Sequence, residues 1–265
     1  MRFIAYGCSY TYGAELADDW LTGKHHNTID KEKVELGANK FYQKYTSWRG
    51  FGPIDDNPEY VKRSNERSYA AEIAKTIGAT EYINKAKSGN TNKAMFLDVA
   101  QDIQNGFLKK DDIIFVGLTS SDRYTWFDSG RTHHGLPGGG SWPNDKVRVA
   151  ILGSWTDDDF AYETILATRA LRDLLKDYKF FYQTIHFPYT RIPYKTALTE
   201  SILVELKDID DNAVVPEYSM WDEITCNKNL PDPPSHGFQH PKIEVANAVG
   251  KKVGIALRTK LGLDK

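Results

Sequence analysis

The sequence is poor in cysteine, in long hydrophobic runs and in charge of one sign. It has two cysteines, Cys8 and Cys226, too few for a disulfide framework, which favours a reducing compartment. No stretch approaches the roughly 20 apolar residues of a membrane-spanning helix, and the first residues turn polar too soon for a secretion signal. The 34 basic and 36 acidic side chains lack the basic surplus that nucleic acids or acidic membranes select. We therefore expect a soluble, cytoplasmic protein without nucleic-acid or membrane partners; the sequence does not fix its oligomeric state.

Motifs for metals and cofactors are also missing. The pairs His25–His26 and His133–His134 are not accompanied by a C-x-x-C or H-E-x-x-H spacing. The glycine run at 138–140 lies away from any predicted junction of a strand with a helix, where a nucleotide-binding loop belongs. We therefore expect neither a metal nor a cofactor.

What the chain does contain is an alternation of predicted strands and helices. Strands are predicted at Arg2 to Cys8, Glu81 to Ala86, Asp112 to Leu118, and Lys179 to Ile185. Helical spacing of apolar residues occurs at 70–77, 96–107, 161–175 and 246–261. This alternation predicts a single α/β domain over residues 1–265, a three-layer α/β/α sandwich around a mainly parallel, flavodoxin-like sheet.

Three segments fall outside the alternation. They are residues 14–66, 121–156 and 187–239, and we expect them to be long, irregular loop insertions.

A serine follows the first predicted strand directly. The segment Gly7–Gly13 reads Gly-Cys-Ser-Tyr-Thr-Tyr-Gly, with glycines that permit a tight turn. Ligands bind beyond the carboxyl ends of the strands in open parallel sheets, so the hydroxyl of Ser9 is placed as a nucleophile would be. The alternative is an ordinary glycine-serine turn. Cys8, still within the strand, is expected to be a buried structural thiol.

This segment resembles block I of the SGNH (GDSL-like) hydrolase superfamily, which reads Gly-Asp-Ser followed by an aromatic residue, a hydroxyl residue and a glycine. Cys8 replaces the aspartate. The resemblance implies a divergent member of that superfamily, with Ser9 as the nucleophile that attacks an ester.

Two further segments resemble the blocks that bind the oxyanion. Asn84–Asn92 is similar to block II, which implies that the backbone N–H of Gly89 faces the oxyanion together with that of Ser9. Block III reads Gly-x-Asn, and here Thr119 stands where that asparagine donates. A threonine hydroxyl has a shorter reach, so Asn90 or Asn92 is the alternative source of the side-chain donor.

The segment before the last predicted helix resembles block V, Asp-x-x-His followed by proline. The match implies that His240, which precedes Pro241, is the general base. The aspartate position is occupied by Gly237, so we expect Asp232 or a backbone carbonyl to orient the imidazole. His236 is the alternative base.

The resemblance implies a serine hydrolase of small acyl esters. An acetyl group on a carbohydrate is the substrate that family analogy suggests, with aromatic residues of the insertions as a wall for sugar stacking. The altered blocks motivate an alternative, a catalytically degenerate SGNH-like protein that binds carbohydrate or serves in assembly, as the similar blocks of some phage-borne relatives suggest. A flavodoxin-like anion binder that uses the turn after the first strand is a third possibility.

Overall fold

A four-stranded parallel sheet forms the centre of the molecule. The computed structural model describes residues 1–14, 16–45, 57–87, 89–119, 124–128, 131–135, 157–185, 210–219 and 243–264. The strands lie in the order β2 (Glu81–Asn84), β1 (Arg2–Gly7), β3 (Ile113–Leu118) and β6 (Lys179–Thr184), and each neighbouring pair is parallel. All four predicted strands are thereby confirmed.

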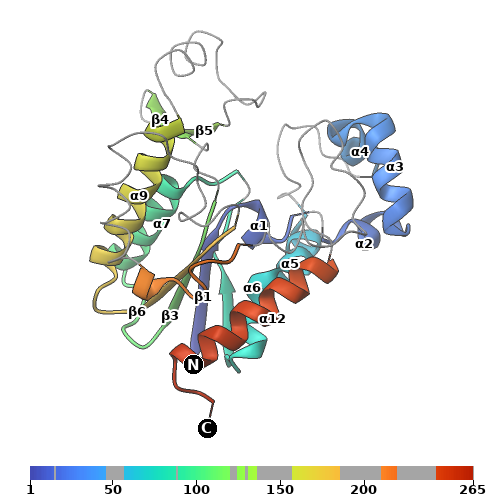
Figure 1. Ribbon diagram of the computed structural model, residues 1–265. Coiled ribbons are helices and arrows are strands. Elements are labelled where there is room, and N and C mark those ends of the chain that lie inside the picture. The colour runs from blue at the N-terminus through green and yellow to red at the C-terminus, as the bar shows by residue number, and fades with distance from the viewer. Residues whose placement is uncertain are drawn as a thin grey trace.

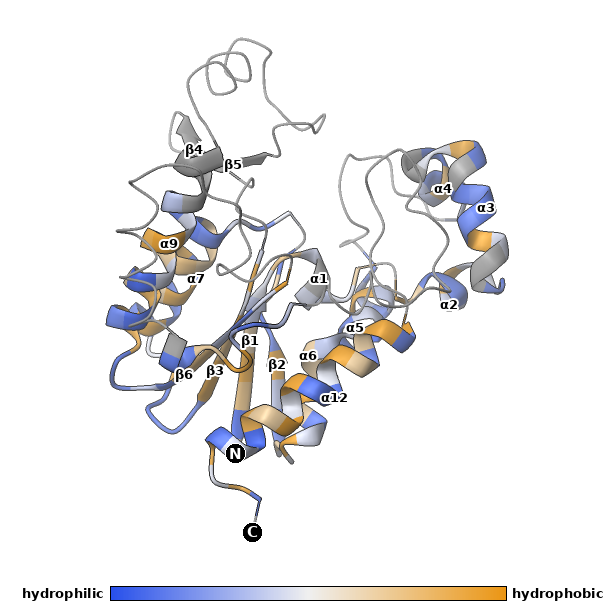
Figure 2. Cartoon of the chain, in the orientation of Figure 1, coloured by the Kyte–Doolittle hydropathy of each residue, from blue (hydrophilic) through white to orange (hydrophobic). Residues whose placement is uncertain are grey.

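Helices cover both faces of this sheet (Figure 1). One face carries α6 (Tyr69–Thr76) and α12 (Ile243–Lys260), and the other carries α7 (Asn92–Gln104) and α9 (Asp157–Leu174). The central strand β3 is buried along its whole length, as expected for a strand with both faces covered. In Figure 2 the central strands are largely hydrophobic, while charged and polar residues lie along the outer sides of the helices. The three-layer α/β/α fold is confirmed.

Side chains alternate between the two helical layers along β1 and β3. Phe115 packs edge-on against Tyr69 of α6, with ring centroids 6.1 Å apart. On the other face the phenol of Tyr6 donates a 2.6 Å hydrogen bond to Asp102 of α7. The guanidinium of Arg2 pairs with both carboxylate oxygens of Asp112, which joins the starts of β1 and β3.

The segment 14–66 is not irregular where the structure describes it, which corrects the prediction. After the short α1 (Ser9–Tyr12), the chain forms α2 (Asp18–Thr22), α3 (His26–Leu36), α4 (Ala38–Tyr45) and α5 (Pro58–Glu66). These helices have a hydrophobic cluster of their own, built from Ala17, Ile29, Phe41, Tyr42 and Tyr60.

A buried carboxylate lies within this helical insertion. Asp18 accepts hydrogen bonds from Tyr60 at 2.7 Å and Tyr42 at 3.2 Å, and pairs with Lys33 at 2.6 Å. Tyr42 and Tyr60 pack in this cluster, and their hydroxyls also bind the carboxylate of Asp18. Because polar side chains thus share the buried face, the sequence shows no continuous row of apolar residues. This explains why the helices were not predicted.

The prediction of irregular structure also fails for part of 121–156. The strands β4 (Tyr124–Asp128) and β5 (Arg131–Gly135) form an antiparallel hairpin. Within 187–239 the structure describes 210–219, where η2 (Asp210–Asn212) is followed by a bridge from Ala213 to Tyr182 of β6. None of the helices described is long and apolar enough to cross a membrane.

Candidate active site

Ser9 lies at the carboxyl end of β1, as predicted. It is the first residue of α1, and its carbonyl accepts hydrogen bonds from the N–H groups of Gly13 at 3.0 Å and Ala14 at 2.9 Å. The left-handed backbone of Gly13, with φ +86°, lets the chain turn sharply after α1. Ser9 itself is 3% exposed. Cys8, just before it, is a fully buried free thiol, in line with the structural role expected for it.

The turn that carries Ser9 is fixed from behind by a hydroxyl pair. The Oγ1 of Thr11 and the phenol oxygen of Tyr69 lie 2.8 Å apart, and both residues are buried. Burial raises the pKa of Tyr69, so the phenol keeps its proton and the pair remains a hydrogen bond.

Two glycines make room for this pair. Gly7 of β1 and Gly117 of β3 are aligned in the sheet. A Cβ on Gly117 would lie 2.2 Å from the phenol oxygen of Tyr69, and one on Gly7 would lie 2.0 Å from Oγ1 of Thr11. Both glycines belong to the motifs identified in the sequence, and their role here is to let α1 and α6 approach the sheet.

Asn84, at the end of β2, holds the same turn from the side. Its amide nitrogen donates to the carbonyl of Thr11 at 3.0 Å and to the side chain of Asn65 at 3.2 Å, and its oxygen accepts from the N–H of Ala86 at 3.0 Å. The amide thereby joins α1, α5 and the chain after β2.

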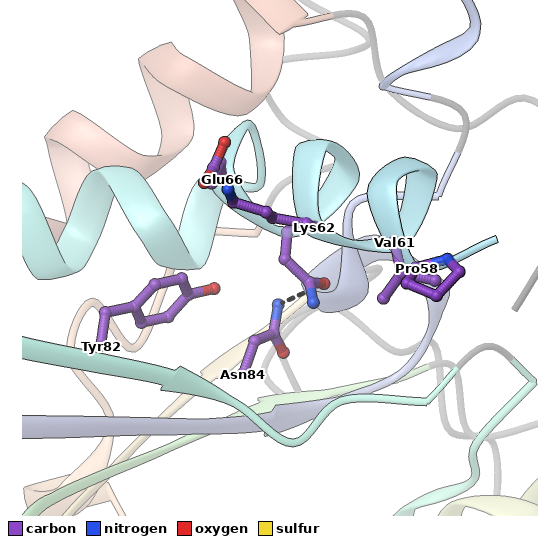
Figure 3. Close-up of a pocket in the computed structure, with 7 residues that line it drawn as sticks. Pro58, Val61, Lys62, Glu66, Tyr82 and Asn84 are labelled. Atoms are coloured by element: carbon purple, nitrogen blue, oxygen red, sulfur yellow. Dashed lines mark hydrogen bonds between the residues drawn. The ribbon is translucent and has the colours of Figure 1, made fainter. Parts of the chain in front are cut away.

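A pocket of about 550 Å³ adjoins Asn84 at the β2 edge of the sheet (Figure 3). Its lining consists of Pro58, Val61, Lys62, Asn65, Glu66, Tyr82 and Asn84. The lining comes from α5 and β2, and it includes none of the residues predicted to react with an ester.

Gly89 lies in the turn after β2, beside the end of β1. The N–H of Lys87 donates to the carbonyl of Gly7 at 3.1 Å, so the chain continues alongside β1 up to this turn. Gly89 is exposed and adopts φ +78°, a left-handed conformation that favours glycine. The side chain of Thr91 caps α7 by accepting from the N–H of Ala94.

Thr119 follows β3 directly and is joined to α7 through its backbone. The amide of Asn92 accepts from the N–H of Thr119 at 2.9 Å, and its nitrogen donates to the carbonyl of Thr119 and to Oγ1 of Thr164, each at 3.1 Å. Both amide hydrogens of Asn92 are thus already donated within the protein. The side-chain Oγ1 of Thr119 is buried and has no hydrogen-bond partner among the residues described.

The structure therefore brings Ser9, Gly89, Thr119 and Asn92 to the carboxyl ends of three adjacent strands, β2, β1 and β3. His240, Asp232 and the alternative His236 lie outside the described residues. Of the aromatic residues expected to stack on sugars, Trp142 and Trp155 also lie outside them, whereas Trp126 and Phe127 belong to β4. Thr11 and Tyr69 also belong to this site, and neither was predicted to do so. The apolar spacing at 70–77, directly after Tyr69, indicates a helix but not a contact with the turn of Ser9.

Within the described parts of the chain, no group of three or more histidine, cysteine, aspartate or glutamate side chains is arranged to hold a metal ion.

No protein-family model and no curated protein matches the chain. Solved structures do match it. It is similar to a member of the lipolytic protein G-D-S-L family from Veillonella parvula, with 10% identity, coverage of 98% of each chain and a TM-score of 0.46. It is also similar to a catalytic mutant of an acetylxylan esterase from Geobacillus stearothermophilus, with 12% identity, coverage of 98% of this chain and 94% of that one, and a TM-score of 0.42.

Proposed function

We propose that the protein is a serine hydrolase that cleaves small acyl esters. The observation that carries the proposal is the position of Ser9 at the carboxyl end of β1, between the turn of Gly89 and the end of β3 at Thr119. Ligands of open parallel sheets bind at this edge, and a nucleophile there is flanked by backbone and hydroxyl donors.

In the proposed mechanism the Oγ of Ser9 attacks the ester carbonyl while His240 removes its proton. The N–H groups of Ser9 and Gly89 donate to the resulting oxyanion, and Thr119 supplies the side-chain donor. We choose Thr119 over Asn92 because the Thr119 hydroxyl has no hydrogen-bond partner among the described residues, whereas the amide hydrogens of Asn92 are both engaged.

The remaining steps regenerate the enzyme. His240 returns its proton to the leaving alcohol as the C–O bond of the ester breaks, which leaves an acyl group on Ser9. Water, deprotonated by His240, then attacks the acyl group. As the bond between the acyl carbon and Oγ of Ser9 breaks, His240 returns the proton to Oγ and the carboxylic acid leaves. In this proposal Asp232 orients the imidazole, and an acetylated carbohydrate is the substrate class suggested by the sequence resemblance.

The test compares hydrolysis of short p-nitrophenyl esters by the wild type, Ser9→Ala and His240→Ala. We expect both variants to lose nearly all turnover, and a fluorophosphonate to label Ser9. Equal rates in all three proteins, or labelling of a residue other than Ser9, would contradict the assignment.

The second candidate function is binding without turnover, and the burial of Ser9 favours it. A nucleophile must be reached by its substrate, and Ser9 is only 3% exposed. Tight binding of a glycan that is never hydrolysed, with an affinity unchanged by Ser9→Ala, would establish this alternative in place of the esterase.

A further inference from the structure

A carboxylate on α7 accepts hydrogen bonds from both sides of the Gly89 turn. One oxygen of Asp98 accepts from Nζ of Lys87 at 2.5 Å, and the other accepts from the side-chain nitrogen of Asn90 at 3.1 Å. The side chain of Asp98 is 19% exposed, and Asn90 is buried. The carboxylate of Asp98 therefore contacts Lys87 and Asn90, the two residues that flank Ser88 and Gly89 in the sequence.

Backbone hydrogen bonds also restrain the two ends of this turn. Its backbone is closed by the N–H of Asn90, which donates to the carbonyl of Lys87 at 3.2 Å. Nothing lies within 4 Å of the position that a Cβ on Gly89 would take, so packing does not hold the glycine. Because glycine has more backbone freedom than any other residue, its order must come from its neighbours.

We propose that Asp98 is a positioning residue that holds the Lys87–Asn90 turn, and with it the N–H of Gly89, in place for the oxyanion. This inference rests on the proposed function. Donors that are already oriented stabilise a developing charge without reorganisation, so a loosened turn weakens the transition state more than the bound substrate.

The main test is Asp98→Ala, assayed with a p-nitrophenyl ester. Removal of an entire oxyanion donor costs about 10²–10³ in turnover, and a donor that is only loosened costs less, so we expect kcat to fall about tenfold with little change in KM. Asp98→Asn keeps an oxygen for Asn90 but loses the ion pair with Lys87, and we expect an intermediate kcat. Asp98→Asn also tests the inference if Asp98→Ala fails to fold.

Two matched variants separate the turn from general effects on α7. Lys87→Met removes the other partner of the ion pair that Asp98→Asn loses, so we expect the same intermediate kcat. Glu163→Gln removes the carboxylate that pairs with Lys93 of α7 at 3.6 Å, away from the turn. We expect this control to leave kcat unchanged.

Amide hydrogen exchange of residues 87–90 tests the positioning directly. We expect faster exchange in Asp98→Ala and wild-type exchange in Glu163→Gln. Wild-type exchange and wild-type kcat in Asp98→Ala would overturn the inference, and a change confined to KM would overturn the oxyanion role. If the wild type shows no turnover that depends on Ser9, the proposed function fails and the oxyanion role with it, while exchange still decides whether Asp98 orders the turn.

Discussion

The hydroxyl of Thr11 and the phenol of Tyr69 form a buried hydrogen bond of 2.8 Å between α1 and α6. The bond lies directly behind the turn that carries Ser9, over the aligned glycines of β1 and β3. The position of the proposed nucleophile therefore depends on a contact that does not itself touch a substrate.

Removal of the phenol oxygen should destabilise the fold. In Tyr69→Phe the buried hydroxyl of Thr11 loses its partner, so we expect the free energy of unfolding to fall by about 1–3 kcal/mol. Urea denaturation measures the change. The matched control is Tyr178→Phe, because the phenol of Tyr178 has no hydrogen bond with a described residue, and there we expect a change within about 0.5 kcal/mol. Equal losses in the two variants would contradict this prediction.

A methyl group on Gly117 should disrupt the hydrogen bond between Thr11 and Tyr69. The new Cβ would lie 2.2 Å from the phenol oxygen of Tyr69 and 2.3 Å from Oγ1 of Thr11, so we expect Gly117→Ala to cost about 1–3 kcal/mol. In a Thr11→Ala, Tyr69→Phe background both oxygens are gone, and the same substitution should cost less. Thermal or urea unfolding of the four proteins gives the comparison, and an equal cost in both backgrounds would place the strain elsewhere.

Thr119→Val should separate activity from stability. The hydroxyl that it removes is buried without a described partner, so the free energy of unfolding should change by less than about 1 kcal/mol. If the hydroxyl donates to the oxyanion, kcat should fall about 10²-fold while KM changes little. Steady-state kinetics with a p-nitrophenyl ester and urea unfolding measure the two effects. An unchanged kcat would remove Thr119 from the mechanism.

Asn92→Ala, unlike Thr119→Val, should clearly reduce the free energy of unfolding. The buried N–H and carbonyl of Thr119 both lose their partner, so we expect a cost of at least about 2 kcal/mol. Asn105→Ala, at the exposed C-terminal end of the same helix, serves as the control in the same denaturation experiment. A fully stable Asn92→Ala protein would mean that the end of β3 is held by other contacts.

The stability of the helical insertion should fall in acid through Glu32. Hydrogen bonds from Lys24, Lys44 and Tyr45 lower the pKa of Glu32 from 4.5 to about 2. A carboxylate whose pKa is lowered by folding stabilises the protein above its unfolded pKa, and this contribution is lost as the pH falls from about 4.5 to about 2. The difference in unfolding free energy between the wild type and Glu32→Gln should therefore shrink across that interval. A difference that stays constant with pH would show that Glu32 does not contribute through its charge.

The centre of the sheet was predictable because β1 and β3 are largely apolar runs. Ile113–Leu118 is buried throughout. A short apolar run of this kind is typical of a central parallel strand, because both faces of such a strand are covered. The position of Ser9 followed from the same pattern, since a motif that directly follows a strand must lie at its carboxyl end. The helices of the segment 14–66 were harder to predict, because their tyrosines serve both as packing groups and as donors to Asp18.

Contacts between distant parts of the chain could not be predicted from spacing. Thr11 and Tyr69 are 58 residues apart, and Asp98 contacts Lys87 and Asn90 across the turn that precedes its own helix. Neither pairing leaves a periodic signal in one sequence. The pairing of Ser9 with His240 remains a prediction, because His240 lies outside the described residues.

The helices α2 to α5 bury apolar side chains in a cluster distinct from the one that surrounds the sheet. Segments unfold together when they share buried surface, so this part of the chain should open at a lower free energy than the strands do. Its loops can then change in length or sequence over evolution without loss of the sheet, and the shape of the region beside Ser9 can vary while the turn that carries the serine stays fixed.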